Sequence, residues 1–378
     1  MKKLIFTLAF SLMCGNLFAS CTKDKDDDII PPAEEQPDDN NKPDEGKPDL
    51  IIPEGCTVIN RATDGTGIDI VVVGDGFTDQ DVADGKWNAA MDSVRKYIFF
   101  MEPYKSYKQL FNVYAIHTAY EGKDLSCLSG DETVETKMCK YTSFLMPHNV
   151  KLDNISKFAY ENTPVKEDKG TADNMFVMFI INSKAMGGGW CSMDLVNYRP
   201  GRAAAVVPFN IFWRTIYGMF AHELMGHGIG HLCDEYIGNT HLGETFPEGN
   251  MGTEYYFRLQ EKGDFVNVTF STDPDDTTRF KNRVWAEMLK NSYHGLKAPV
   301  EGAVTYPKGV WRATTNSIMV GATTSGCYFN PVQREAIIRR LYKLSGKEKE
   351  YSLDVFYEYD KRNEDWDKDW INKPYDKI

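Results

Sequence analysis

The stretch Phe220-Ala-His-Glu-Leu-Met-Gly-His-Gly-Ile-Gly-His-Leu-Cys-Asp-Glu-Tyr236 decides which fold we expect for this chain. From about residue 210 to residue 231 the chain is mostly apolar or glycine, which predicts a helix buried behind a sheet. This helix carries two imidazoles around one carboxylate, and burying such groups is unfavourable unless a partner compensates them. A divalent metal ion is the simplest partner. His222, Glu223 and His227 are therefore the first candidate site residues.

The spacing of the two histidines is unusual for a metal site on a helix. His222 and His227 are five residues apart, whereas the better-known motif of zinc peptidases places its histidines four apart. Because each residue of an α-helix turns by ~100°, a spacing of four separates the side chains by ~40° and a spacing of five by ~140°. Both imidazoles can reach one ion only if the helix is widened by one residue, as in a π-bulge. Gly226 would ease that distortion.

The third metal ligand is not fixed by the motif. Asp234 is the first candidate, because it lies beyond Gly230, where the chain can turn back, and carboxylates are accepted zinc ligands. His231 and Glu235 are the other candidates for this role, and Asp234 could instead orient one of the ligand histidines without contacting the metal itself. With zinc and a water molecule at the remaining corner, Glu223 would be the general base of a hydrolytic reaction. The pattern favours hydrolysis without a covalent intermediate.

Longer segments of the chain resemble known peptidases. The run from His222 to His227 resembles the longer zinc motif of the dipeptidyl peptidase III family. Gly74-Asp-Gly-Phe-Thr78, residues 226–230 and residues 232–236 together are similar to the IgA-peptidase family of zinc metalloendopeptidases, which is metzincin-like. This second similarity covers most of residues 60–345. It implies a zinc-dependent peptidase acting on extracellular proteins, with Glu223 as catalytic residue and zinc on His222, His227 and Asp234.

The same resemblance continues after the metal motif. Trp311-Arg-Ala-Thr-Thr-Asn-Ser-Ile-Met319 resembles the segment that follows the active site in the IgA-peptidase family. Within it, Ser317-Ile-Met319 is similar to the methionine turn that metzincins place beneath their metal. Phe329-Asn-Pro-Val-Gln-Arg-Glu335 resembles the closing helix of the family. The family's shorter histidine spacing is absent here, which motivates an alternative function: a catalytically inactive surface lipoprotein that binds host glycoprotein or glycan on a peptidase scaffold.

The secondary-structure pattern predicts a mixed α/β (α+β) fold. Apolar, β-branched runs predict strands at residues 68–73, 110–118, 174–181 and 202–208. A helix is expected from a cap at Thr78 or Asp79 to about Phe100. Together with the helix at residues 210–231, this order predicts a zincin/metzincin-like fold: a mixed twisted sheet with a backing helix and an active-site helix, plus a C-terminal subdomain.

The N-terminal segment is typical of an exported lipoprotein. Residues 1–20 combine two lysines, a short apolar core and small residues, which predicts a signal peptide. Phe18-Ala-Ser-Cys21 resembles a bacterial lipobox, which implies lipidation at Cys21. Residues 21–55 are rich in Asp, Glu, Lys and Pro and predict a flexible tether. We expect an outer-membrane or cell-surface lipoprotein held to the membrane by its lipid, with periplasmic retention as the other possibility.

The remaining composition narrows the classes of partner. The net charge of -12 argues against nucleic acid, and a protein or peptide substrate, such as a host glycoprotein, is the expected partner. No linker interrupts residues 56–350, so we expect one catalytic domain there and a C-terminal extension at residues 351–378. Cys127 and Cys139 are close enough in sequence to bridge a loop. His117, His148, His241 and His294 are expected to be surface or structural residues.

Overall fold

The computed structural model describes residues 51–128, 131–142, 150–166, 175–183, 189–193, 203–208, 218–321 and 328–370. The expected signal peptide, Cys21, nearly all of the expected tether, and His148 lie outside the described residues, as does the first part of the helix expected at residues 210–231. Within the described part, no helix is both long enough and apolar enough to cross a membrane.

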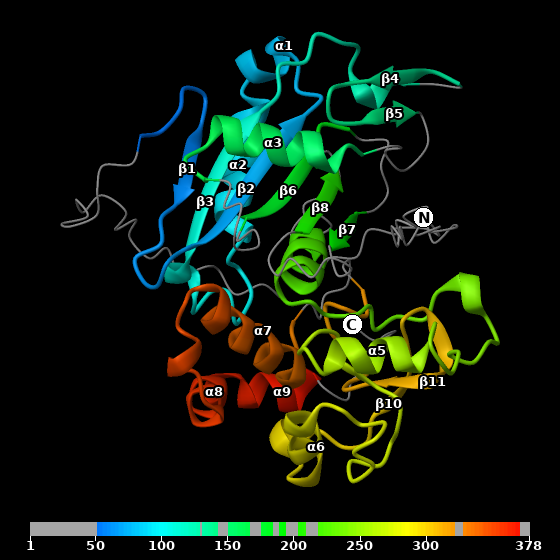
Figure 1. The fold of residues 1–378 in the computed structure, drawn as a ribbon. Helices are drawn as coiled ribbons and strands as arrows, with labels where there is room; N and C mark the ends of the chain where they lie inside the picture. The colour runs from blue at the N-terminus through cyan, green and yellow to red at the C-terminus, as the bar shows by residue number, and fades with distance from the viewer. Residues whose placement is uncertain are drawn as a thin grey trace, which may run out of the picture.

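A six-stranded mixed sheet forms the upper half of the molecule (Figure 1), with the strand order β1-β3-β2-β6-β8-β7. The four inner strands are parallel, and the two edge strands, β1 and β7, are antiparallel to their neighbours. The inner strands confirm the four strands expected from the sequence. The bounds are β1 Thr57–Asn60, β2 Ile68–Asp75, β3 Phe111–His117, β6 Met175–Ile181, β7 Trp190–Met193 and β8 Ala203–Pro208.

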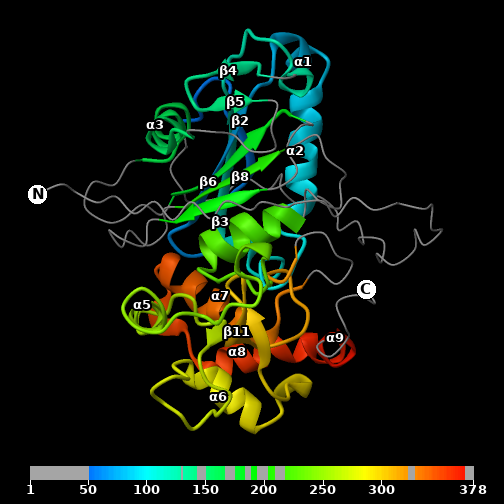
Figure 2. The same cartoon turned by 90° about the vertical axis from the view of Figure 1, so that its right-hand side faces the viewer.

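Helices cover both faces of this sheet. Alternate residues of β2 face opposite sides: Ile70 packs in the cluster that holds helix α2 (Lys86–Tyr97), and Val71 packs in the cluster that holds α3 (Leu152–Asn162). Figure 2 shows the sheet between these two helices. Because both faces are covered, the inner strands β2, β3 and β6 are mostly apolar, which explains why their sequence shows apolar runs instead of strict alternation.

The helix expected from Thr78 to Phe100 is two helices. Thr78 caps α1 (Asp79–Ala83) as predicted, in a capping box with Asp81. The chain then breaks at Gly85, whose φ of 79° is left-handed and therefore incompatible with a continuous helix. The single-helix prediction was wrong because the apolar spacing of α2 extends across this break.

The lower half of the molecule contains the candidate site helix and most of the remaining helices (Figure 1). Its elements are the π-helix η3 Phe220–Ile229, helices α5 Thr253–Gln260, α6 Arg283–Lys290, α7 Pro331–Leu344, α8 Leu353–Asp360 and α9 Glu364–Trp370, and a three-stranded sheet of β9 Val268–Thr269, β10 Val300–Ala303 and β11 Tyr306–Arg312. Short 3-10 helices connect these parts: η1 Lys108–Leu110, η2 Leu125–Cys127, η4 Asn239–His241, η5 Tyr293–Gly295, η6 Glu348–Glu350 and η7 Lys361–Asn363.

The segment between β3 and α3 forms a small hairpin of β4 (Thr133–Glu135) and β5 (Lys140–Thr142). It is fixed to the end of β2 by the buried carboxylate of Asp75, which accepts hydrogen bonds from Thr118, Thr136 and Tyr141 at 2.6–2.7 Å. Cys127 and Cys139 form no disulfide with each other, because Cys127 is exposed and Cys139 is buried. Hydrogen bonds to one carboxylate therefore hold this segment, instead of the expected bridge.

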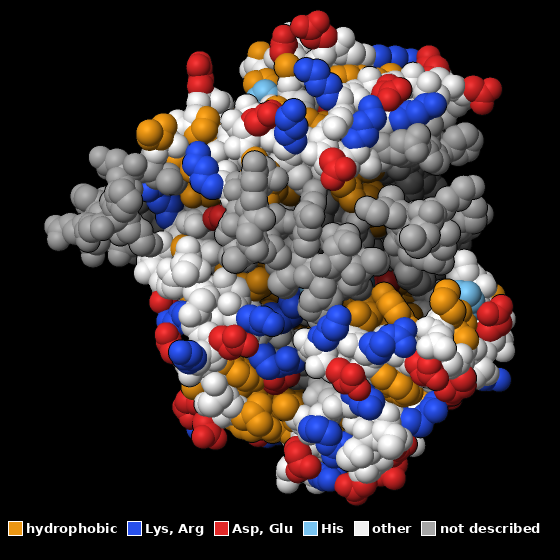
Figure 3. Space-filling view, viewed as in Figure 1, with side chains coloured by type: hydrophobic (Ala, Val, Ile, Leu, Met, Phe, Trp, Pro, Cys, Tyr) orange, Lys and Arg blue, Asp and Glu red, His pale blue; other side chains and the backbone are white. Residues whose placement is uncertain are grey.

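Charged side chains of both signs are interspersed over the face shown in Figure 3. Exposed apolar side chains lie between them, and the most exposed in the lower half are Leu242 and Met251, which are 69% and 80% exposed. Acidic side chains are therefore mixed with basic ones on this face and are not gathered in one patch there.

Candidate metal centre

The helix that carries the two motif histidines is a π-helix from Phe220 to Ile229. Hydrogen bonds in a π-helix join residues five apart, and Gly230 N–H donates to Met225 O in this way at 2.9 Å. Residues five apart therefore lie one above the other. The widening expected at one position extends over ten residues, and it puts His222 and His227 on the same side.

The two imidazoles point at one carboxylate oxygen. The Nε2 atoms of His222 and His227 lie 3.0 Å and 3.1 Å from Oδ1 of Asp234. Their ring centres are 4.8 Å apart. Each Nδ1 lies close to a backbone carbonyl, Ile318 O at 2.8 Å and Leu232 O at 2.7 Å. Since a carbonyl only accepts, both Nδ1 atoms donate, and both Nε2 atoms are left to face the centre of the site.

Burial and the neighbouring charges set the proton affinities of these groups. Burial alone would lower the pKa of His227, but the charge and hydrogen bond of Asp234 raise it to about 9. The pKa of His222 is raised in the same way, against the effect of its burial. Burial would raise the pKa of Asp234, but the two imidazoles hold it well below its usual range. The electrostatic surroundings of this group therefore favour a positive charge at its centre.

Glu223 lies between the two histidines in sequence and close to them in space. One carboxylate oxygen of Glu223 and one ring nitrogen of each histidine all lie within 4.8 Å of one another. Its side chain is buried, and this burial raises its pKa against the lowering effect of both imidazoles. A carboxylate with a raised pKa is a better proton acceptor at neutral pH, which is the property that a general base requires.

The other candidates for third ligand have partners elsewhere. His231 has a left-handed backbone, with φ of 49°, and its Nδ1 lies 2.7 Å from Oδ1 of Asp264. Burial and the nearby Arg340 lower the pKa of His231 to about 4. Glu235 is fully buried, and its carboxylate accepts hydrogen bonds from Asn267 and Ser317. Of the three candidates, Asp234 is the one that contacts both Nε2 atoms.

The predicted methionine turn lies against the site helix. Ile318 O accepts the hydrogen bond from His222, and Met319 is fully buried beside Gly226. A Cβ atom added to Gly226 would lie 2.4 Å from Sδ of Met319. Gly226 is therefore required by the close packing of this turn, in addition to the backbone freedom that the sequence suggested.

Strand β7 is a part of the site region that the sequence did not predict. It contacts the site helix η3. Burial raises the pKa of Cys191 on this strand, and the charges of Glu223 and Asp234 raise it further, as expected for a thiol near the site carboxylates. The strand is four residues long and half-buried, so it has no continuous apolar run that would reveal it.

Two tyrosines and a cysteine near the metal motif and the predicted methionine turn make backbone contacts that fix their segments. Tyr328 is buried, and its backbone carbonyl accepts from Ile318 N–H at 2.8 Å. Cys233 is buried, and its backbone N–H donates to Oδ1 of Asn267. Tyr236 is half-buried directly after Glu235, and its carbonyl accepts from Thr305 N–H.

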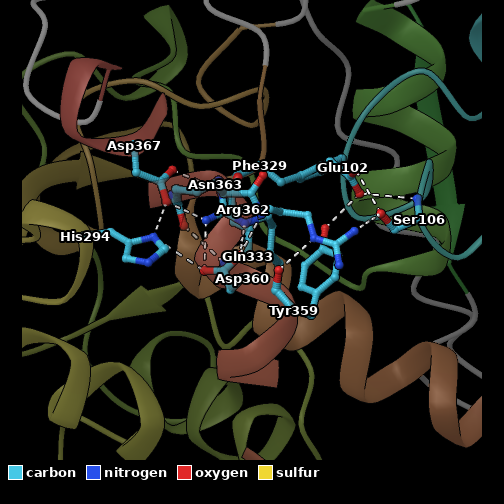
Figure 4. A network of polar contacts seen from close by, with 12 residues as sticks. Glu102, Ser106, His294, Phe329, Gln333, Tyr359, Asp360, Arg362, Asn363 and Asp367 are labelled. Atoms are coloured by element: carbon cyan, nitrogen blue, oxygen red, sulfur yellow. Dashed lines mark hydrogen bonds and ion pairs between the residues drawn. The ribbon is translucent and has the colours of Figure 1, made fainter. Parts of the chain in front are cut away.

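A second group of metal-ligand types lies in the lower half, where His294, Asp360 and Asp367 point toward one another (Figure 4). The guanidinium of Arg334 lies between both carboxylates, at 2.6 Å and 3.0 Å from Asp360 and 3.1 Å and 2.5 Å from Asp367. His294 Nδ1 is 2.6 Å from Asp367. The buried arginine supplies the positive charge that a metal would supply, so this cluster is a structural ion network.

This network joins α7 to α8 and α9, and thereby joins residues expected in a C-terminal extension to the body of the protein. Sequence reasoning missed it because its members lie up to 73 residues apart along the chain and no spacing pattern joins them. The expected boundary at residue 351 stays a prediction.

Comparison with known protein families relates this chain to a family of peptidases. Residues 58–292 match the family described as IgA Peptidase M64. The match includes β2, the site helix and the loop that carries Asp234. A comparison with curated proteins finds no match.

Proposed function

This chain belongs to the IgA peptidase M64 family, and we propose that it is a zinc-dependent peptidase that hydrolyses peptide bonds of extracellular proteins. Membership of the family makes it a peptidase with a protein or peptide substrate. The choice of zinc, the roles of single residues and the extracellular location of the substrate are our proposal.

The observation that carries the proposal is the convergence of two imidazole Nε2 atoms on one oxygen of Asp234. In a regular α-helix, residues five apart would be separated by ~140°, and the rings would diverge. The π-helix removes this divergence. It also removes the reason to prefer an inactive binding scaffold, because that alternative relied on the extra residue having separated the two histidines.

The residues present fit a zinc ion. Two neutral imidazoles and one carboxylate are a usual ligand set for catalytic zinc, and each imidazole is held by a backbone carbonyl through its other nitrogen. His222, His227 and Asp234 would hold the ion. When bound, zinc supplies Lewis-acid polarisation of a carbonyl and lowers the pKa of water.

Glu223 would perform the proton transfers. Its buried carboxylate lies beside both histidines and is poised, through its raised pKa, to accept a proton near neutral pH. It would take the proton from the water molecule that attacks the peptide carbonyl, and then deliver this proton to the leaving amine. No covalent bond between the substrate and the protein is needed in this sequence.

We further propose that the mature protein begins at a lipidated Cys21 and lies at the outer membrane or cell surface. The support is the signal-like segment before Cys21 and the acidic tether after it. Such an anchor would keep the peptidase domain close to the membrane while the tether gives it reach toward large substrates.

The test is metal analysis and turnover of the wild type and of Glu223→Gln. The wild type should contain about one zinc per chain and cleave a labelled protein such as casein. A chelator should remove both the bound zinc and the cleavage activity. Glu223→Gln should retain the zinc and lose about 10²–10⁴-fold in turnover, because the amide cannot accept the proton. Zinc-free wild type, or a fully active Glu223→Gln variant, would refute the proposed function.

A further inference from the structure

The carboxylate of Glu235 is fully buried directly next to Asp234. Its two oxygens accept from different parts of the chain: Oε1 accepts from Nδ2 of Asn267 at 2.9 Å, and Oε2 accepts from Oγ of Ser317 at 2.7 Å. In addition, Glu235 N–H donates to Met319 O at 2.7 Å. One residue thus joins the loop that carries Asp234 to two segments distant in sequence.

The Ser317 side of this contact leads to His222. Ser317 Oγ also accepts from Met319 N–H at 3.2 Å, which fixes the turn over residues 317–319. The middle residue of that turn, Ile318, provides the carbonyl that accepts from Nδ1 of His222 at 2.8 Å. The orientation of the His222 ring therefore depends on a turn that Glu235 holds in place.

The Asn267 side of the contact leads to Asp234. The amide of Asn267 binds both backbone groups of Cys233, with Oδ1 accepting from N–H at 2.8 Å and Nδ2 donating to the carbonyl at 3.0 Å. The same Nδ2 donates to Glu235. Asn267 and Glu235 thus hold the residues on either side of Asp234, which leaves its carboxylate directed at the two imidazoles.

We infer that Glu235 is a positioning residue for the metal centre, which clamps the Asp234 loop to the turn that orients His222. The inference rests on the proposed metal site. It assigns Glu235 no contact with the ion or the substrate, and it explains why a carboxylate is buried beside the site without facing the two imidazoles.

The hydrogen-bond pattern requires a carboxylate at this position. Ser317 Oγ already accepts from Met319 N–H and from Nε2 of Gln333, so its own proton must go to Glu235. Asn267 presents its NH₂ group, because its oxygen already accepts from a backbone N–H. Both neighbours are donors, and a glutamine amide would place a third donor against one of them. Glu235→Gln should therefore break the clamp at nearly constant volume.

The experiment compares Glu235→Gln with Glu335→Gln. Glu335, on α7, is a matched control because it is also a buried glutamate whose carboxylate accepts a hydrogen bond. Its donor is the hydroxyl of Tyr351, at 2.6 Å. The first readout is the set of histidine ring resonances in NMR spectra of the metal-free proteins. The second is affinity for zinc by chelator competition, together with the visible absorption spectrum after cobalt substitution.

In Glu235→Gln we expect the His222 ring signals to shift or broaden, zinc affinity to fall 10–100-fold, and the cobalt spectrum to change. Glu335→Gln should leave all three as in the wild type. Ser317→Ala, which removes only one hydroxyl, provides a second test, and its effect on the His222 signals should exceed its effect on the His227 signals.

A folded Glu235→Gln protein with unchanged His222 signals and unchanged zinc affinity would overturn the inference. If Glu235→Gln does not fold, unchanged His222 signals in Ser317→Ala would overturn it instead. Failure of the wild type to bind zinc would refute the proposed function but not the clamp, because the ring signals of the metal-free protein report the clamp directly.

Discussion

Replacing Gly226 with alanine tests whether the packing of the site helix is as close as the structure shows. Helix propensity alone predicts a gain of about 1 kcal/mol in the free energy of unfolding, because glycine is unfavourable inside helices. The packing predicts the opposite. The new methyl group would lie 2.4 Å from Sδ of Met319, which is fully buried, and 3.3 Å from the backbone oxygen of Ala221. Overpacking of this kind costs about 1–3 kcal/mol, so we expect Gly226→Ala to be destabilising.

The assay is urea unfolding of the metal-free protein, followed by circular dichroism, in a double-mutant cycle with Met319→Ala. Met319→Ala alone should cost about 2–5 kcal/mol through the cavity that it leaves. In the double variant the added methyl group partly fills that cavity, so the combined loss should be smaller than the sum by about 1–3 kcal/mol. Zinc affinity should fall in Gly226→Ala, because His227 follows directly. A Gly226→Ala protein as stable as the wild type, with additive effects in the cycle, would refute this account of the packing.

Two further predictions concern buried charge. Arg334→Met should lower the free energy of unfolding by about 3–5 kcal/mol, because it leaves Asp360 and Asp367 buried without their cation. The control Arg95→Met, on the exposed face of α2, should change the free energy of unfolding by less than about 1 kcal/mol. Similar urea midpoints for the two variants would contradict the role of the network. His231 has a pKa of about 4 in the folded protein and an ordinary pKa of 6.5, so the unfolded chain takes up a proton at this residue before the folded protein does. The free energy of unfolding should therefore be unaffected by His231 above about pH 6.5 and decrease by roughly 3 kcal/mol as the pH falls toward 4. Urea midpoints measured from pH 7.5 to pH 5 should show this loss in the wild type and a smaller loss in His231→Gln, and identical pH profiles would exclude His231 as its source.

The parts of the fold that the sequence predicted well are those buried on both faces. The strands β2, β3 and β6 contain continuous apolar runs, because side chains on both of their faces are buried in the two hydrophobic clusters that cover the sheet. The edge strands β1 and β7 were missed because they are short and half-buried. The break between α1 and α2 was missed because a single left-handed glycine interrupts a pattern that otherwise continues.

The widening of the site helix could be predicted because it follows from the number of residues between the two histidines. Two histidines and a glutamate on an apolar helix need a common partner, and five residues of spacing cannot bring the rings together in a regular α-helix. That inference uses only the order of residues along the chain. The extent of the π-helix, ten residues in place of one bulge, depends on packing against the sheet and against Met319.

The sequence by itself predicted that His222, Glu223 and His227 form one group and offered three candidates for a third ligand within the next eight positions. It could not choose between His231, Asp234 and Glu235, which are all polar and all near the end of the same helix. Tertiary structure distinguishes them, because Asp264 binds His231, Asn267 and Ser317 bind Glu235, and Asp234 contacts both imidazoles. These partners come from positions 32 to 82 residues away, so the direction of each side chain was decided by contacts that local sequence does not contain.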